Sequence, residues 1–160
     1  MIPDYTKANF DFAALPSLLN ARRTLNLSGV ALGLIHLGPG QGYSFTHSHR
    51  EQEEVYMVLE GSGQIVLDGK LESLVRGDFI RVSPHVRRAL NAGDEGLIAI
   101  CAGGIPCGYP KNENARYLID DGIPYYDDLP PWAQDDPQAQ ERNRNLAQRM
   151  ERSRIKKNSE

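Results

Sequence analysis

Between residues 29 and 102 the sequence is a succession of short apolar stretches, each followed by residues that favour turns. The stretches are five to eight residues long, and such short runs bounded by turn residues are typical of β-strands. No helical pattern alternates with them, so the sequence predicts an all-β antiparallel sandwich or barrel. The predicted strands are residues 30–37, 43–49, 54–59, 63–67, 70–75, 78–82, 87–91 and 97–102.

Glycine and aspartate mark the turns between these strands. Asp68-Gly69 separates two of the strand patterns, and this dipeptide predicts a tight hairpin. Further turns are predicted at residues 61–63 and 92–94, where glycine again interrupts the apolar pattern.

The rest of the chain differs from this central region. The N-terminal arm is predicted to contain one helical piece at residues 13–23, interrupted by Pro16, and the region after the barrel is rich in glycine, proline, tyrosine and aspartate. We expect the latter to be irregular chain that wraps the barrel. The charged tail is expected to be helical or partly disordered, with Asp136 as its N-cap and Pro137 as its first helical residue. The predicted segments are therefore residues 1–28, 29–102, 103–134 and 135–160.

His47 and His49 stand one residue apart in the predicted strand 43–49. Successive side chains of a strand alternate between its faces, so both imidazoles point the same way. Glu54 follows five residues after His49, whereas the side chain of Glu53, the alternative carboxylate, should leave the opposite face. Two imidazoles and a carboxylate that converge can hold a divalent transition metal, so His47, His49 and Glu54 are the predicted ligands.

The sequence around these residues resembles the first motif of the cupin superfamily. That motif is a glycine, five residues, H-x-H, three or four residues, a glutamate, six residues and a glycine. His47, His49, Glu54 and Gly61 match it from the first histidine onward. The initial glycine is displaced by one residue.

A degraded form of the second cupin motif follows. This motif is a glycine, five residues, P-x-G, two residues, a histidine, three residues and an asparagine. Gly77 matches its start, and His85 stands where the glycine of P-x-G belongs. The position of the motif's histidine falls on Arg88 when it is counted from Gly77, and on Arg87 when it is counted back from Asn91. On either count an arginine replaces the histidine.

The resemblance covers residues 29–102 and implies a double-stranded β-helix, or jelly-roll barrel, with the motif residues at its mouth. Terminal arms often complete dimers in such proteins. The predicted strand 54–59 is also apolar on the face away from Glu54, through Val55, Met57 and Leu59. We therefore expect a homodimer.

The arginine changes what the site can do, because a guanidinium stays protonated and cannot coordinate a metal. Its charge would oppose a nearby dication by on the order of several kcal/mol at an effective dielectric near 20. Arg88, Tyr56 and His85 are the predicted substrate-binding residues, with Arg88 turned towards Glu54 or towards an anionic group of the substrate. Alternatively, His85 swings in as the missing ligand, or no metal is present and Arg88 binds a carboxylate or phosphate beside the histidines.

The predicted function is that of a metal-dependent enzyme, such as an oxygenase, isomerase or decarboxylase, on a small polar or anionic molecule. Two histidines and one carboxylate suit Fe(II) and also hold Mn, Ni, Co or Zn, so the cofactor is expected to be one of these metals. The alternative is a non-catalytic module that binds a small anion or sugar without a metal.

Charge and cysteine content restrict the partners and the compartment. Residues 142–160 carry seven basic and two acidic side chains, so residues 1–141 carry a net charge of −8, which argues against nucleic acid as the partner of the barrel. Two cysteines make no disulfide framework, no signal peptide is visible, and the apolar runs are too short to span a bilayer. We expect a cytoplasmic protein with a small-molecule ligand and no membrane partner.

Overall fold

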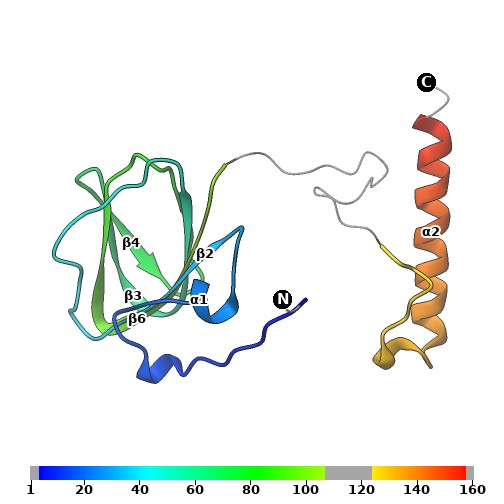
Figure 1. Ribbon diagram of the computed structural model, residues 1–160, viewed down its shortest axis with the longest axis horizontal. Helices are drawn as coiled ribbons and strands as arrows, with labels where there is room; N and C mark the ends of the chain where they lie inside the picture. Colours follow the sequence, from blue (N-terminus) through cyan, green and yellow to red (C-terminus); the bar gives the residue numbers. More distant parts are fainter. Residues whose placement is uncertain (1–3, 107–123, 158–160) are drawn as a thin grey trace. The chain divides into compact units, whose positions relative to one another are not determined.

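The computed structural model describes residues 4–106 and 124–157. The chain falls into two compact units, residues 1–106 and residues 107–160. In the described part of the first unit, six strands form one antiparallel sheet in the order β1-β2-β6-β3-β4, with β5 paired to β3 (Figure 1). The predicted all-β architecture is therefore confirmed. The strands are β1 Leu18–Asn20, β2 Ala31–Leu37, β3 Glu53–Leu67, β4 Lys70–Val75, β5 Phe79–Val82 and β6 Arg88–Gly104.

Strands β3 and β6 are long and pair with each other along most of their length. The register shifts between Gly61 and Gly63, across from residues 93–96 of β6. The turns predicted at 61–63 and 92–94 were therefore wrong. What looked like two strands in each case is one strand that bends through an irregularity, and such bends let a strand curve around a barrel.

Gly61 lies at this bend in a conformation that excludes other residues. Its φ is 74°, and a Cβ placed on it would lie 2.0 Å from the carbonyl oxygen of Gly96. Only glycine combines this backbone conformation with so close an approach of two chains. The glycine that ends the first motif is thus required by the contact between β3 and β6.

The hairpin predicted at Asp68-Gly69 is confirmed. Leu67 pairs with Lys70, and the two residues between them have φ angles of 47° and 87°. Two successive positive φ angles are typical of a type I′ turn, whose twist matches that of the flanking strands. This local sequence signal therefore determined both the turn and the register of β3 with β4.

The segment before β3 follows the start of β6 without forming a regular strand. It makes two bridges to β6, Gly42 with Asn91 and His47 with Arg88. The bridged residues are five positions apart on this segment but only three apart on β6. The chain bulges between the bridges, and the prediction of a regular strand at 43–49 was therefore wrong. Two backbone hydrogen bonds, of 3.0 and 2.9 Å, nevertheless hold His47 opposite Arg88.

The N-terminal arm also departs from the prediction of a helix at 13–23. It contains a 3₁₀ turn at Phe12–Ala14, strand β1, and a short helix α1 at Arg22–Leu25. Pro16 interrupts the helical pattern, because proline inside a helix removes a hydrogen bond and clashes with the preceding turn. Strand β1 instead pairs with β2 and so gains partners for its backbone groups.

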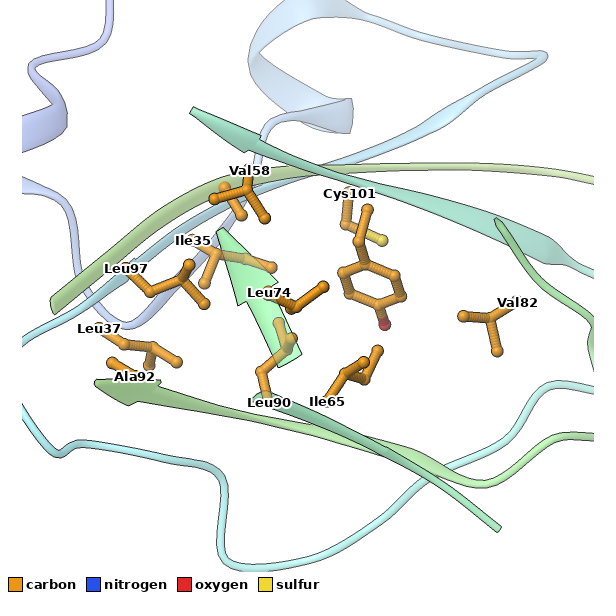
Figure 2. Packing of buried hydrophobic residues seen from close by; sticks show 12 residues of the cluster. Ile35, Leu37, Val58, Ile65, Leu74, Val82, Leu90, Ala92, Leu97 and Cys101 are labelled. Carbon is orange, nitrogen blue, oxygen red and sulfur yellow. The ribbon is translucent and has the colours of Figure 1, made fainter. Parts of the chain in front are cut away.

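The side chains between the curved parts of the sheet form one apolar core (Figure 2). They come from β2, β3, β4, β5 and β6, and Ile65 in the centre is 0% exposed. Burial of this apolar surface is the main driving force for folding. The core residues are Ile35, Leu37, Tyr56, Val58, Ile65, Leu74, Val82, Leu90, Ala92, Leu97, Ala99 and Cys101.

The second unit is described over residues 124–157 and contains a long helix, α2 Pro137–Lys157. The Asp136 carboxylate accepts a hydrogen bond of 2.9 Å from the backbone nitrogen of Gln138, and Pro137 is the first helical residue. The predicted start of the helical tail is therefore confirmed, with an N-cap followed by proline.

The remainder of this unit contains a 3₁₀ turn, η2 Pro131–Ala133. Most of the irregular segment predicted at 103–134 lies outside the described residues. Among the helices within the described ranges, none combines the length and the apolar character needed to cross a membrane.

Candidate metal centre

The three predicted metal ligands lie close together in the structure. His47 and His49 lie in the segment before β3, and Glu54 is the second residue of β3. Their ligand atoms all lie within 4.8 Å of one another. His49 Nε2 is 3.0 Å from Glu54 Oε1, His47 Nε2 is 4.0 Å from Glu54 Oε2, and the two imidazole rings meet edge to face.

The alternation of side chains along β3 decides which glutamate belongs to this group. Glu54 points inwards with Tyr56, which is part of the core. Glu53 points the other way and forms an ion pair of 2.9 Å with Arg81. Glu54 is therefore the carboxylate of the group, and Glu53 lies on the opposite face.

The Glu54 carboxylate is almost completely enclosed by donors. Tyr56 Oη donates to its Oε2 at 2.8 Å, and Arg88 donates to the same oxygen from Nε at 3.2 Å and from Nη2 at 3.0 Å. Its Oε1 accepts a hydrogen bond of 3.1 Å from Gln52 Nε2 and lies 3.0 Å from His49 Nε2. These contacts explain how Glu54 can be only 7% exposed without a large free-energy cost, since each carboxylate oxygen has several partners.

Arg88 is the arginine that reaches the site, and it is 0% exposed. Besides its two bonds to Glu54, it donates from Nη1 to the carbonyl oxygens of Pro84, at 3.0 Å, and Val86, at 2.7 Å. Arg87 is exposed and lies beside Asp68, 3.6 Å from its carboxylate. The structure therefore places Arg88, and not Arg87, next to the histidines.

The other predicted substrate-binding residues lie in different surroundings. Tyr56 is 4% exposed and contacts Glu54, whereas His85 is exposed in the turn before β6 and is not part of the ligand group. Contacts of Arg88, Tyr56 and His85 with a substrate stay predictions.

The surroundings of the ligands also set their protonation states. Burial by itself raises the pKa of Glu54, but the Tyr56 hydrogen bond and the charges of His49 and Arg88 outweigh it and hold the pKa below its usual value. Burial, followed by the positive charge of Arg88, lowers the pKa of His47. At neutral pH the carboxylate is therefore ionised and the His47 imidazole neutral, which are the forms that bind a metal.

The residues present fit a divalent metal in number, kind and access. They offer two imidazole nitrogens and one carboxylate oxygen, the set found in many transition-metal sites with open positions. The His47 and His49 side chains are 38% and 31% exposed, whereas those of Glu54 and Arg88 are 9% and 1% exposed. A metal and a small molecule can therefore approach from the histidine side, while the carboxylate side is closed.

Gln52 is the site residue that sequence reasoning missed. It belongs to no motif and stands just before β3, yet it donates a hydrogen bond to Glu54. The available signal was the two-residue periodicity, since Gln52, Glu54 and Tyr56 share one face of an extended chain.

Comparison with known proteins agrees with this fold. Residues 33–103 match the family model described as a cupin domain. The solved structure of a cupin protein from Bacteroides fragilis is 28% identical, covers 78% of this chain and 99% of its own, and superposes with a TM-score of 0.64. A sugar phosphate isomerase of the cupin superfamily from Silicibacter pomeroyi is 29% identical, with 54% of this chain and 57% of its own covered and a TM-score of 0.48.

A curated relative is the uncharacterized protein MJ1618 of Methanocaldococcus jannaschii, which is 34% identical over 65 residues, or 40% of this chain. The chain spans about half of the length of that relative, 48%.

The matched residues 33–103 agree closely with the region 29–102 in which the sequence resembles cupins, and the predicted jelly-roll barrel is confirmed. Residues 33–103 are therefore identified as a cupin domain.

Proposed function

We propose that this chain is a metal-dependent cupin enzyme that acts on a small polar or anionic molecule. The observation that carries the proposal is the convergence of His47, His49 and Glu54, whose ligand atoms lie within 4.8 Å of one another. The lowered pKa values of His47 and Glu54 favour the protonation states that a metal requires.

The division of the site into an open and a closed side supports a reaction at the histidine end of the barrel. A divalent metal bound there would supply a Lewis acid that polarises an oxygen of the bound molecule. The two imidazoles would hold the metal at the entrance, and the Glu54 carboxylate would anchor it from within. The packed core behind Tyr56 keeps water and ligand from going deeper into the barrel.

The metal-free alternative has less support from the contacts of Arg88. A guanidinium that binds an anionic ligand must offer free donors, but this one is buried and already forms an ion pair with Glu54. An anion at the site would have to displace Glu54 from its charged partner, which leaves a buried carboxylate unpaired. We therefore favour the metal-dependent function.

Titration of the metal-free protein with Co²⁺ tests the proposal, in a preparation without a histidine tag. We expect one equivalent to bind, and we expect alanine at both His47 and His49 to abolish this binding. The other two histidines of the chain, His36 and His85, provide the matched control, since alanine at both should leave the stoichiometry unchanged. Equal binding by the two double variants would refute the proposed ligands, and no binding by the unsubstituted protein would refute the proposed function.

We also propose that the chain forms a homodimer through the outer face of its sheet. Phe79 on β5, Met57 on β3 and Ile100 on β6 lie side by side in register on this face, and Phe79 is 70% exposed. An apolar row of this kind is stabilised when a second surface covers it. Sedimentation should give a dimer for the unsubstituted protein and a monomer for Phe79→Glu. Leu71→Glu, at a site on β4 that is 61% exposed, should remain dimeric. A monomeric unsubstituted protein would contradict this proposal.

The proposal also includes a small-molecule substrate and a cytoplasmic location for the protein. Cys101 is a buried free thiol, and burial raises its pKa to about 12, so it stays protonated and unreactive. The net charge of −8 over residues 1–141 repels nucleic acid from the barrel. Both observations are compatible with a reduced compartment and a small ligand.

A further inference from the structure

Gln52 contacts the carboxylate of Glu54 from a position outside both cupin motifs. Its Nε2 donates to Oε1 at 3.1 Å, while Tyr56, two residues beyond Glu54, donates to Oε2 at 2.8 Å. Two neutral donors on the same face of the extended chain around Glu54 therefore hold the carboxylate from opposite ends. Together with the two hydrogen bonds from Arg88, they determine the plane of the carboxylate.

The two carboxylate oxygens of Glu54 differ in how many hydrogen bonds they already accept, and therefore in how readily each could coordinate a metal. Oε2 accepts three hydrogen bonds, one from Tyr56 and two from Arg88. Oε1 accepts from Gln52 and meets only one other group, the Nε2 atom of His49, which is itself a predicted metal ligand. When His49 turns its nitrogen lone pair to a metal, Gln52 is the donor that stays on Oε1. Oε1 is therefore the oxygen that is free to coordinate.

Gly103 provides the space in which the Gln52 side chain lies. It pairs with Glu54 across the β3–β6 ladder. A Cβ at Gly103 would lie 2.4 Å from Gln52 Nε2 and 2.6 Å from its Cδ, which is closer than any real contact. Even an alanine there would push the amide away from Oε1, because the obstructing atoms are the end of a flexible side chain.

We infer that Gln52 is a positioning residue, which orients Oε1 of Glu54 towards the metal, and that Gly103 is small in order to admit it. The inference rests on the proposed function. A neutral amide suits this place, because it donates a hydrogen bond without adding charge beside the Glu54–Arg88 pair. Partners that orient a ligating carboxylate typically contribute about 10–100-fold to metal affinity.

Substitution of Gln52 by methionine tests this role, because methionine has a similar length and no donor. The affinity for Co²⁺ is expected to fall by about 10–100-fold, with a changed visible spectrum of the bound ion, since Oε1 loses its orientation. Gln64→Met is the control, because Gln64 is exposed on the same strand and away from the site. Thermal unfolding of the metal-free variants shows whether the fold itself has changed.

Gly103→Ala tests the same contact by a second route, with Gly104→Ala as its control, since a Cβ at Gly104 meets only the carbonyl oxygen of Gly29, at 3.8 Å. Gly103→Ala should reproduce the loss seen for Gln52→Met, and the double variant should lose no more than either single variant. Unchanged Co²⁺ affinity and spectrum in both single variants, or fully additive losses, would overturn the inference while the proposed function stood. An unsubstituted protein that binds no Co²⁺ would overturn both.

Discussion

Replacement of Arg88 by methionine is expected to lower the free energy of unfolding by about 3–5 kcal/mol at pH 7 in the metal-free protein. The guanidinium is fully buried and forms an ion pair of 3.0 Å with Glu54. Without it, an ionised carboxylate remains inside the barrel without its ion-pair partner. The carbonyl oxygen of Val86 loses the guanidinium as its donor, and that of Pro84 keeps only the backbone nitrogen of His49. Chemical denaturation followed by circular dichroism, in the presence of a chelator, measures this loss.

The loss should depend on pH in a defined direction. In the unsubstituted protein the pKa of Glu54 is lowered from its ordinary 4.5, so its ion pair stabilises the folded state above that value and is lost as the pH falls through the lower, folded-state pKa. In Arg88→Met the effect of burial is opposed by fewer partners, so we expect the pKa of Glu54 to rise above its usual value. The folded variant then takes up a proton more readily than the unfolded chain, and the difference in stability between the two proteins should narrow from pH 7 towards pH 4.

Arg87→Met is the matched control for this prediction. Arg87 is the preceding residue, is exposed, and lies near Asp68 at a solvent-screened distance of 3.6 Å. Its loss should change the stability by less than about 1 kcal/mol and without the same dependence on pH. A similar loss for both arginines, or a pH-independent loss for Arg88→Met, would contradict the assigned ion pair.

Replacement of Arg88 by histidine is expected to tighten Co²⁺ binding by about 100-fold, which corresponds to about 2.7 kcal/mol. The change removes a fixed positive charge beside the metal site, and at an effective dielectric near 20 such a charge opposes a dication by on the order of several kcal/mol. It also releases Glu54 Oε2 from two hydrogen bonds and adds an imidazole opposite His47. Competition with a chromophoric chelator measures the affinity.

The metal should also restore the stability that Arg88→His loses, because a ligand that binds only the folded state stabilises it in proportion to its affinity. Arg87→His adds a histidine one residue away and leaves the ion pair between Arg88 and Glu54 intact. This variant should bind Co²⁺ as the unsubstituted protein does. A folded Arg88→His variant with unchanged or weaker affinity would mean that Arg88 acts chiefly by holding Glu54 in place.

Much of the candidate site could be predicted because its residues are close in the sequence. The two-residue spacing of His47 and His49 predicts that both imidazoles lie on one side, and the alternation along β3 separates Glu54 from its neighbours. The bridge between His47 and Arg88 then brings the histidines to Glu54. Glu53 could be separated from Glu54 by the same rule, and its ion pair with Arg81 lies on the opposite face as expected. Local spacing therefore identified the candidate ligand group.

The parts that sequence reasoning missed depend on contacts between distant residues. Glycines near Gly61 signal a turn in any single stretch of sequence, but pairing with β6 keeps β3 continuous through that point. The helical pattern at residues 13–23 gives way to strand β1, because the edge of β2 offers hydrogen bonds that the isolated arm lacks. In both places a tertiary ladder overrides a local preference.

The sequence by itself determined that this chain forms a cupin barrel with two histidines and a glutamate at its mouth, because strand periodicity and turn residues act over a few neighbouring positions. Only the tertiary structure decided which arginine enters the site, since the choice between Arg87 and Arg88 depends on how β6 pairs with the segment around His47. It also decided that Gln52 reaches Glu54, since the space at Gly103 comes from the opposite strand. The residue types of the proposed ligands were thus encoded locally, whereas the side chains that contact Glu54 were set by the register between distant strands.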